Sequence, residues 1–176
     1  MKHLRLFALC IASFLAFAGA GTQAWPEGAD LKVEVSGLRN YKGQVVLWLW
    51  AVAEQGRFPD PSKVQHRDEG ANDLPCNFPQ MATCRRIVSS LQDLTISYTF
   101  KSVPAGDYAV FVFHDENNNK LLDTGMLKRP LEAVGYSQLL PDEVRPLANK
   151  VTFQQAHFTL KGPQTITIGL RYPPRL

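Results

Sequence analysis

The sequence lacks the short motifs that mark the commonest catalytic and cofactor sites. It has no Gly-x-Ser-x-Gly elbow, which many serine hydrolases use to expose their nucleophile. It also has no Gly-x-Gly-x-x-Gly or other phosphate-cradling loop, so a nucleotide site has no support. His66 and His157 lie far apart and belong to no His-x-His or His-Glu-x-x-His pattern. No catalytic residue is therefore identified from motifs.

The excess of positive over negative charge is also small once the N-terminus is set aside. The chain has 19 Lys and Arg and 16 Asp and Glu among its 176 residues, a net charge of +3. Lys2 and Arg5 supply two of these charges in a segment without acidic residues, so its removal leaves +1. No basic run with interleaved aromatic residues occurs, so nucleic acid is excluded as an expected partner.

The N-terminus itself has the parts of a secretory signal. Lys2 and Arg5 precede an apolar run, 6–17, that is too short to cross a bilayer comfortably. Cleavage after Ala24 leaves 152 residues, and the alternatives are a cut after Ala20 or retention as an anchor. We predict a signal peptide at 1–24, a single domain at 25–176, and a periplasmic or secreted protein without a membrane span after cleavage.

Few cysteines are present, and only Cys76 and Cys84 remain after that cleavage. An even number of cysteines in an oxidising compartment favours a disulfide, here closing a loop of nine residues. The chain-entropy model assigns such a loop roughly 2.5 kcal/mol of stabilisation. A metal pair is the alternative, but neither Cys-x-x-Cys spacing nor a nearby histidine supports it.

The rest of the chain is a series of short apolar segments separated by turns. Leu31, Val33 and Val35 alternate with polar residues, as in a strand with one buried face. Seven strands are expected, at 31–36, 44–53, 86–91, 94–100, 108–113, 153–160 and 164–172. Residues 58–84 contain four prolines and are interpreted as an inserted loop. The pattern predicts an all-β, antiparallel two-sheet sandwich of about seven strands.

The segment 44–53 is apolar on both faces, which few surface strands are. Trp48 and Trp50 lie on one face, about 7 Å apart along the strand. Such a pair either packs in a core or stacks on a sugar ring or a partner's apolar patch. The same face carries Val46 and Val52, which favours the core.

A loop rich in asparagine follows the segment 108–113 and its histidine. Numbered from Asp115, oxygen-bearing side chains occur at the first, third, fifth and ninth positions, which are Asp115, Asn117, Asn119 and Asp123. Leu121, at the seventh, offers its carbonyl. A hard cation such as calcium takes six to eight oxygen ligands, and this spacing is typical of calcium-binding loops. The spacing predicts Ca²⁺ as the one possible cofactor.

Two positions depart from that calcium-loop pattern. Lys120 stands at the sixth position, where glycine is usual, and Met126 at the twelfth, where a bidentate glutamate is usual. Glu116 is expected to point outward, and Glu132 or Asp142 could come from the following loop to fill the gap. Binding in the range of roughly 0.1–1 mM is then expected. The alternative is an asparagine-rich turn without metal, since Asn tolerates left-handed geometry.

The stretch from Pro104 to Asn117, followed by Leu122-Asp123-Thr124, resembles the core of an uncharacterised bacterial family, number 2141 among the domains of unknown function. The flanks agree with it at 38–45, 58–59, 128–137 and 153–158. The resemblance implies an exported β-sandwich of the transthyretin or immunoglobulin kind, and it implies no established activity. The family has glycines where this chain has Asn118 and Lys120.

These observations favour an exported binding or accessory module for an unknown protein, peptide or glycan. One alternative is an enzyme that uses His114 with Asp115 or Asp123. Another is a purely structural envelope protein, in which the face of Trp48 and Trp50 is buried. The apolar segment 125–137 either covers one end of the sandwich or offers a peptide-binding surface.

Overall fold

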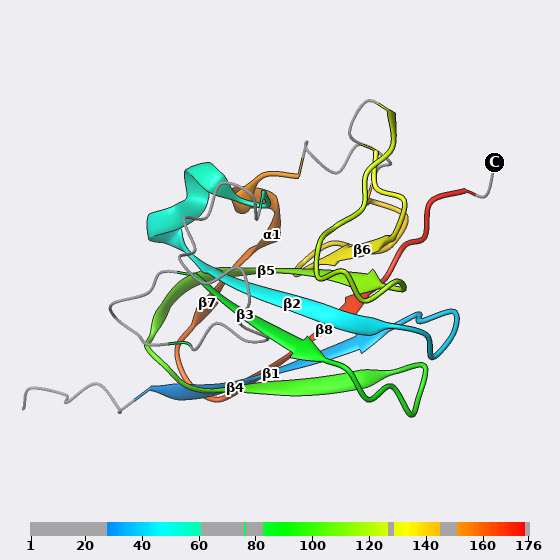
Figure 1. The fold of residues 1–176 in the computed structure, drawn as a ribbon. Coiled ribbons are helices and arrows are strands. Elements are labelled where there is room, and N and C mark those ends of the chain that lie inside the picture. Colours follow the sequence, from blue (N-terminus) through cyan, green and yellow to red (C-terminus); the bar gives the residue numbers. More distant parts are fainter. Residues whose placement is uncertain (1–27, 61–75, 77–82, 127–128, 145–150, 175–176) are drawn as a thin grey trace, which may run out of the picture.

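The computed structural model describes residues 28–60, 76, 83–126, 129–144 and 151–174 (Figure 1). The predicted signal peptide at 1–24 lies outside the described residues. Most of the predicted insertion at 58–84 lies outside them as well. These two predictions therefore stay predictions.

The described residues form two β-sheets, as the alternating sequence pattern predicts. One sheet has the order β4-β1-β8, and the other has the order β3-β2-β5-β6, with β7 pairing β5. The strands are β1 (Ala29–Ser36), β2 (Gln44–Ala51), β3 (Thr83–Val88), β4 (Ile96–Val103), β5 (Gly106–Asp115), β6 (Ala133–Tyr136), β7 (His157–Leu160) and β8 (Gln164–Gly169). The all-β, two-sheet sandwich is thus confirmed.

One strand pair departs from the antiparallel expectation. β8 runs parallel to β1, with Leu31 opposite Gln164 and Ser36 opposite Gly169. The chain reaches β8 from β7 on the other sheet, so it crosses between the sheets instead of turning back in a hairpin. Beyond β8, Arg171 exchanges two backbone hydrogen bonds with Val134 of the five-stranded sheet, at 2.9 and 3.0 Å. This bridge joins the two sheets along one side.

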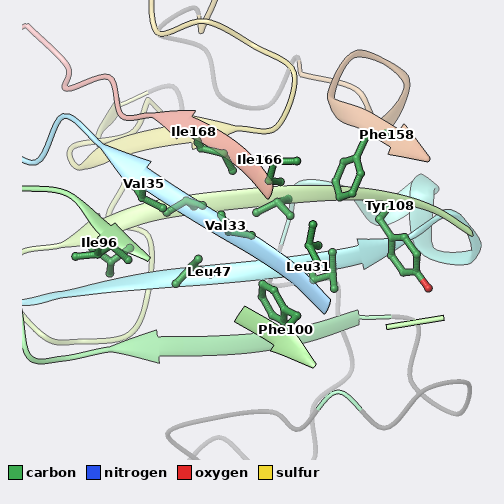
Figure 2. Packing of buried hydrophobic residues seen from close by; sticks show 14 of the residues in the cluster. Leu31, Val33, Val35, Leu47, Ile96, Phe100, Tyr108, Phe158, Ile166 and Ile168 are labelled. Atoms are coloured by element: carbon green, nitrogen blue, oxygen red, sulfur yellow. The ribbon is translucent and has the colours of Figure 1, made fainter. Parts of the chain in front are cut away.

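The main core lies between the two sheets. Alternate side chains of β1, Leu31, Val33 and Val35, are fully buried there, as the period of two in the sequence requires. Leu47 of β2 meets them from the five-stranded sheet (Figure 2). Their partners in β1 face outward and are polar, so one side of the three-stranded sheet remains in contact with water.

A second, aromatic cluster covers the other face of the five-stranded sheet. Trp50 is fully buried, and its ring lies 5.8 Å from that of Phe58, which in turn lies 5.9 Å from Phe153. The 3₁₀ helix η1 (Val52–Arg57) and the single-turn helix α1 (Phe153–Ala156) lie side by side over this face (Figure 1). β2 is therefore central and covered on both sides, which confirms the core interpretation of the tryptophan pair.

Several element boundaries differ from the sequence-based expectations, and one strand was not expected. The strand expected at 44–53 ends at Ala51, where η1 begins. The strand expected at 153–160 starts with α1, because the Thr152 N–H donates to Gln155 Oε1 at 2.9 Å and closes a helical turn. β6 was not expected, since its four residues have no usable periodicity. It forms through pairing with the segment Phe111–His114 of β5.

Cys76 and Cys84 form the expected disulfide, with their Cα atoms 5.1 Å apart. Cys84 lies in β3 and is fully buried in the main core, so the bridge anchors residue 76 to the edge of the five-stranded sheet. In the described part of the chain, no helix is both long and apolar enough to span a membrane.

Candidate functional site

The end of β5 presents His114 and Asp115 on opposite faces of the sheet, because successive side chains of a strand alternate. His114 follows Val110 and Val112 toward the main core, whereas Asp115 follows Phe111 and Phe113 toward the aromatic side. The proposed enzymatic pair of His114 with Asp115 is therefore not brought together.

His114 is fully buried, and both of its ring nitrogens have partners. Nε2 lies 2.7 Å from the Lys42 carbonyl, and Nδ1 lies 2.6 Å from the Tyr172 hydroxyl. Since a carbonyl only accepts, Nε2 carries the proton, and the Tyr172 hydroxyl donates to Nδ1. The same hydroxyl accepts the Arg39 N–H at 3.0 Å. His114 thus connects the β1–β2 loop to the C-terminal segment, and neither nitrogen is left to face a substrate.

Asp115 is the anchor of the asparagine-rich loop. It is fully buried, and its Oδ2 accepts the Gln44 side-chain amide at 2.6 Å and the Lys120 N–H at 2.7 Å. Its Oδ1 accepts the Asn119 N–H at 3.2 Å. Gln44 stands opposite Asp115 in the β2–β5 register, which brings the amide to the carboxylate. A buried carboxylate needs such partners, and these fix its orientation.

The loop then curls through a repeated side-chain-to-backbone hydrogen bond. Asn117 Oδ1 accepts the Asn119 N–H at 3.0 Å, and Asn119 Oδ1 accepts the Leu121 N–H at 2.8 Å. Asn118 has φ 63° and Lys120 has φ 65°, both in the left-handed region. These are the two positions at which the resembled family has glycine, which has no steric cost there. Both residues therefore adopt left-handed backbone although neither is glycine.

The predicted ligand side chains converge on Asp123. Its Oδ2 accepts the Asn117 side-chain amide at 2.6 Å, and its Oδ1 accepts the Asn119 amide at 2.9 Å. The Leu121 side chain points to solvent and is 66% exposed. The side chains of the third, fifth and ninth positions are thus in contact, whereas Asp115, at the first, contacts only the backbone N–H groups of Asn119 and Lys120 within the loop.

Glu132, which immediately precedes β6, closes the neck of this loop. Its Oε1 accepts the Glu116 N–H at 3.2 Å, and its Oε2 accepts the Asp123 N–H at 3.0 Å. Burial, together with the charges of Asp115 and Asp123, raises the pKa of Glu132 to about 7, although its two N–H bonds act in the other direction. Of the two carboxylates considered for completing the ligand set, Glu132 is beside the loop. Asp142 is exposed in the separate turn after Leu140.

Glu116 points away from the loop's interior, as expected, and binds the β1–β2 loop. Its carboxylate forms a two-pronged ion pair with Arg39 and accepts the Asn40 amide at 2.5 Å. The hydrogen bonds with Arg39 lower the pKa of Glu116, against the opposing effect of burial. The Arg39 guanidinium also lies 4.4 Å above the Tyr172 ring. Sequence patterns missed Arg39, Gln44 and Tyr172, since these contacts depend on tertiary pairing.

The candidate metal ligands are of the chemical type that a hard cation prefers, but their arrangement suits a cation only in part. All candidate ligands offer oxygen, which calcium prefers. Within the described ranges, no group of three or more His, Cys, Asp or Glu side chains is arranged to hold a metal ion. The reason is visible at Asp115 and Glu132, whose oxygens face backbone N–H groups. Asp123 likewise faces two amide groups.

A family model described as "Uncharacterized protein conserved in bacteria (DUF2141)" matches residues 33–167. The match covers more than half of the chain, from β1 to β8, and includes the loop after β5. The chain therefore belongs to this family, as the resemblance indicated. No curated protein and no solved structure matches the chain.

Proposed function

We propose that this member of the DUF2141 family is an exported binding or accessory module whose loop 115–123 holds Ca²⁺. The ligands would be the side chains of Asp115, Asn117, Asn119 and Asp123, with the carbonyl of Leu121. One observation carries the proposal, namely that the amides of Asn117 and Asn119 both meet the Asp123 carboxylate, at 2.6 and 2.9 Å. These contacts bring three of the proposed ligand side chains together, with amide nitrogens facing the carboxylate.

Glu132 supplies the carboxylate that the twelfth position lacks. It reaches the loop from the residue before β6 and contacts the backbone of Asp123 at 3.0 Å. Its pKa is raised mainly by burial and further by the negative charges of Asp115 and Asp123, which repel its carboxylate. A divalent cation would relieve this repulsion. Lys120, one residue from Leu121, opposes the cation, so weak binding in the range of roughly 0.1–1 mM is expected.

Calcium binding requires a local rearrangement that can be stated in advance. Asn117 and Asn119 now donate their amide hydrogens to Asp123. A cation beside Asp123 replaces those hydrogens, and each amide turns its oxygen inward. Each Oδ1 atom now accepts a loop N–H, and turning the amide gives up that hydrogen bond in exchange for the metal.

Calorimetry with millimolar calcium on the mature protein tests the proposal. Heat of binding and a higher melting temperature than in a chelator control are expected. Asp123→Asn should abolish both, because it removes the charge on which the amides converge. Asp142→Asn, a loss of one exposed carboxylate outside the loop, is the matched control and should change neither. The absence of heat and of any melting shift in the unaltered protein would contradict calcium binding.

Export rests on two features of the chain. The N-terminal segment has the charge, apolar run and small residues of a secretory signal. Cys76 and Cys84 are paired, as suits an oxidising compartment. Mass spectrometry of the protein recovered from the periplasm or medium should find Trp25 at the N-terminus. A full-length chain in the cytoplasm would contradict export.

A purely structural role in the envelope is the second candidate. It is favoured by the burial of Trp48 and Trp50, whose side chains are 3% and 0% exposed and so do not offer rings to a sugar. Weak acrylamide quenching of tryptophan fluorescence is expected from this burial. A structural protein without calcium binding would show that weak quenching together with a silent calorimetric titration.

A further inference from the structure

β4 is an edge strand of the three-stranded sheet, and its outer side meets no other strand in the described part of the chain. It pairs with β1 alone and runs along the lower margin of the sandwich in Figure 1. Alternate residues of an edge strand direct their backbone N–H and C=O groups away from the sheet. Such a row of groups is a template for pairing with a strand of another chain.

Three other strands at sheet edges are partly covered. β6 and β8 lie at the opposite edges of the two sheets, where a backbone bridge joins Val134 to Arg171. β3 is tied to Cys76 by the disulfide. From β3, Arg86 Nε donates to the Tyr98 hydroxyl at 2.7 Å and so joins the two sheets beside β4. What remains open at β4 is therefore its backbone edge and not the core behind it.

Over most of its length, β4 also lacks the features that block edge pairing. The regular part of its edge, Ile96–Phe100, has no proline, no glycine and no charged side chain. Its β-branched and aromatic side chains are those that favour extended backbone. The register with β1 shifts only beyond Phe100, where Ser102 has φ 51° and Lys101 carries a charge. This irregularity protects one end of the strand and leaves Ile96–Phe100 open.

We propose that this open edge pairs, antiparallel, with the same edge of a second copy of the chain, about a two-fold axis through Tyr98. On the core side of the sheet, Ile96 then lies opposite the second copy's Phe100, and the two Tyr98 residues lie opposite each other. On the outer side, Ser97 lies opposite the second copy's Thr99. Pairs of an aromatic with a β-branched residue, of two aromatics and of two hydroxyls stabilise antiparallel strands. The segment is thus complementary to itself, as a two-fold interface requires.

The ends of the paired segment are complementary as well. In this register Lys101 of one copy lies opposite Thr95 of the other and diagonal to its Asp93, at the roughly 7–8 Å that separate diagonal neighbours. Lys101 and Asp93 are both exposed, so they are free to approach each other across the interface. Leu94, which is 41% exposed, lies opposite Ser102 of the other copy and loses contact with water. The second copy therefore matches this edge in charge and in apolar surface.

The expected dimer is weak and does not involve the calcium-loop segment. A pair of strands this short buries less than the roughly 1,200 Å² at the lower limit of standard interfaces, so association should depend on concentration. The three-stranded sheets of the two copies would join into one continuous sheet. The loop 115–123 follows β5 of the other sheet, so pairing should be the same in calcium and in chelator. This inference therefore stands or falls separately from the proposed metal site.

Analytical ultracentrifugation of the mature protein in chelator tests the inference. The sedimentation coefficient should rise with concentration, from that of a monomer toward that of a dimer. In the dimer, the N–H groups of Ile96–Phe100 that point away from β1 should exchange with solvent more slowly, and those of β8 should not change. A chain that stays monomeric up to about 1 mM overturns the proposal, as does unchanged exchange in β4.

Substitutions that place charges opposite each other test the register itself. Ser97→Lys combined with Thr99→Lys puts lysine opposite lysine twice across the axis and should weaken the dimer at least roughly tenfold. Ser97→Lys combined with Thr99→Glu puts lysine opposite glutamate at the same two points and should restore the dimer. Thr165→Lys combined with Thr167→Lys, at exposed positions of β8 on the other edge of the same sheet, is the matched control. It should dimerise like the unaltered protein.

The outcomes separate this edge from other surfaces of the molecule. A dimer that survives the two lysines in β4, or that the β8 control weakens equally, overturns the proposal. Loss of the dimer in both β4 variants, with circular dichroism showing intact sheets, also overturns it, because opposite charges would then not meet across the axis. A dimer that forms only in calcium places the interface elsewhere and overturns it as well. If the variant with two lysines does not fold, hydrogen exchange in the unaltered protein decides.

Discussion

β5 passes from an aromatic layer into a polar network within a few residues. The first region is stabilised by packing of apolar rings, and the second by hydrogen bonds to carboxylates. Phe111 stacks on Tyr136 at 5.1 Å within a cluster that also contains Trp50 and Phe58. At the end of the same strand, Asp115 accepts three hydrogen bonds. The aromatic layer is stabilised by removal of apolar surface from water, which does not depend on pH or on ions.

The stability of the polar region, by contrast, does depend on pH and on ions. Asp115 and Glu132 are buried carboxylates, and Glu132 accepts the Asp123 N–H at 3.0 Å. Each must be compensated by hydrogen bonds, protons or a cation, because an uncompensated buried charge is costly. The aromatic layer therefore stabilises the fold at any pH, whereas the stability that the polar loop contributes depends on pH.

The largest loss of stability should come from removing one ring from the aromatic layer. Trp50→Ala removes a fully buried ring and leaves a cavity between η1 and the sheet, so the free energy of unfolding should fall by about 3–5 kcal/mol. Trp50 Nε1 has no hydrogen-bond partner among the described residues, so the loss is one of packing alone. Urea denaturation followed by circular dichroism measures it.

Val52→Ala is the control for that substitution, since Val52 follows β2 and is 40% exposed. It should change the free energy of unfolding by no more than about 0.5 kcal/mol. The loss caused by Trp50→Ala should be the same at acidic and neutral pH. A loss that varies with pH would contradict the separation of the two regions.

The next effect is a dependence of stability on pH that comes from Glu132. Its pKa is raised from 4.5 to about 7 in the folded protein, so folding favours the protonated carboxyl. This contribution is fully present below about pH 4.5 and is lost as the pH rises through about 7. The difference in pKa corresponds to at most about 3 kcal/mol, and solvent near the loop reduces it to on the order of 1–2 kcal/mol. Denaturation in chelator at several pH values measures it.

Glu132→Gln tests the assignment, because it removes the titrating group and keeps an oxygen that accepts one N–H. The fall in stability between about pH 5 and pH 8 should be smaller in this variant than in the unaltered protein. Acids whose pKa is lowered, such as Glu116, act below this window and should contribute equally in both proteins. Equal slopes would assign the pH dependence to another group.

A smaller effect is expected where the polar region meets the C-terminal segment. Tyr172→Phe removes the hydroxyl that contacts His114 Nδ1 at 2.6 Å and accepts the Arg39 N–H at 3.0 Å. The ring remains beneath the Arg39 guanidinium. The free energy of unfolding should fall by about 1 kcal/mol, since both partners lose a hydrogen bond at a half-buried position. Tyr41→Phe, at a ring that is 57% exposed, should change nothing measurable.

The aromatic layer and the polar loop also differ in how far the sequence predicts them. The doubly apolar pattern of β2 indicates a central strand, and alternation at Leu31, Val33 and Val35 indicates the opposing sheet. Both follow from the period of side chains along a strand. The four residues of β6 give no such pattern, because their strand is imposed by backbone pairing with β5.

In the loop, the local part was predictable and the tertiary part was not. The spacing of Asp115, Asn117, Asn119 and Asp123 indicates a curled loop because its contacts span only a few residues. The Gln44 contact to Asp115 spans 71 positions and requires the β2–β5 register to be known. Glu132 was one of two candidates, and only the position of β6 beside β5 selects it over Asp142.

The smallest effect, and the sharpest test of the loop, is expected from Lys120→Gly. Glycine relieves the left-handed strain at φ 65°, worth roughly 1 kcal/mol, but it also frees the unfolded chain by a similar amount. In chelator, the free energy of unfolding should therefore change by less than about 0.5 kcal/mol. In calcium, affinity should rise about fivefold, because a monovalent and a divalent cation separated by roughly 8 Å of water repel by about 1 kcal/mol. Lys120→Ala should gain the same affinity through loss of charge, and it keeps both the strain and the restricted unfolded chain, so its stability in chelator should also stay within about 0.5 kcal/mol of the unaltered protein. A loop that binds calcium equally well with lysine, alanine or glycine at this position would not be the site of the metal.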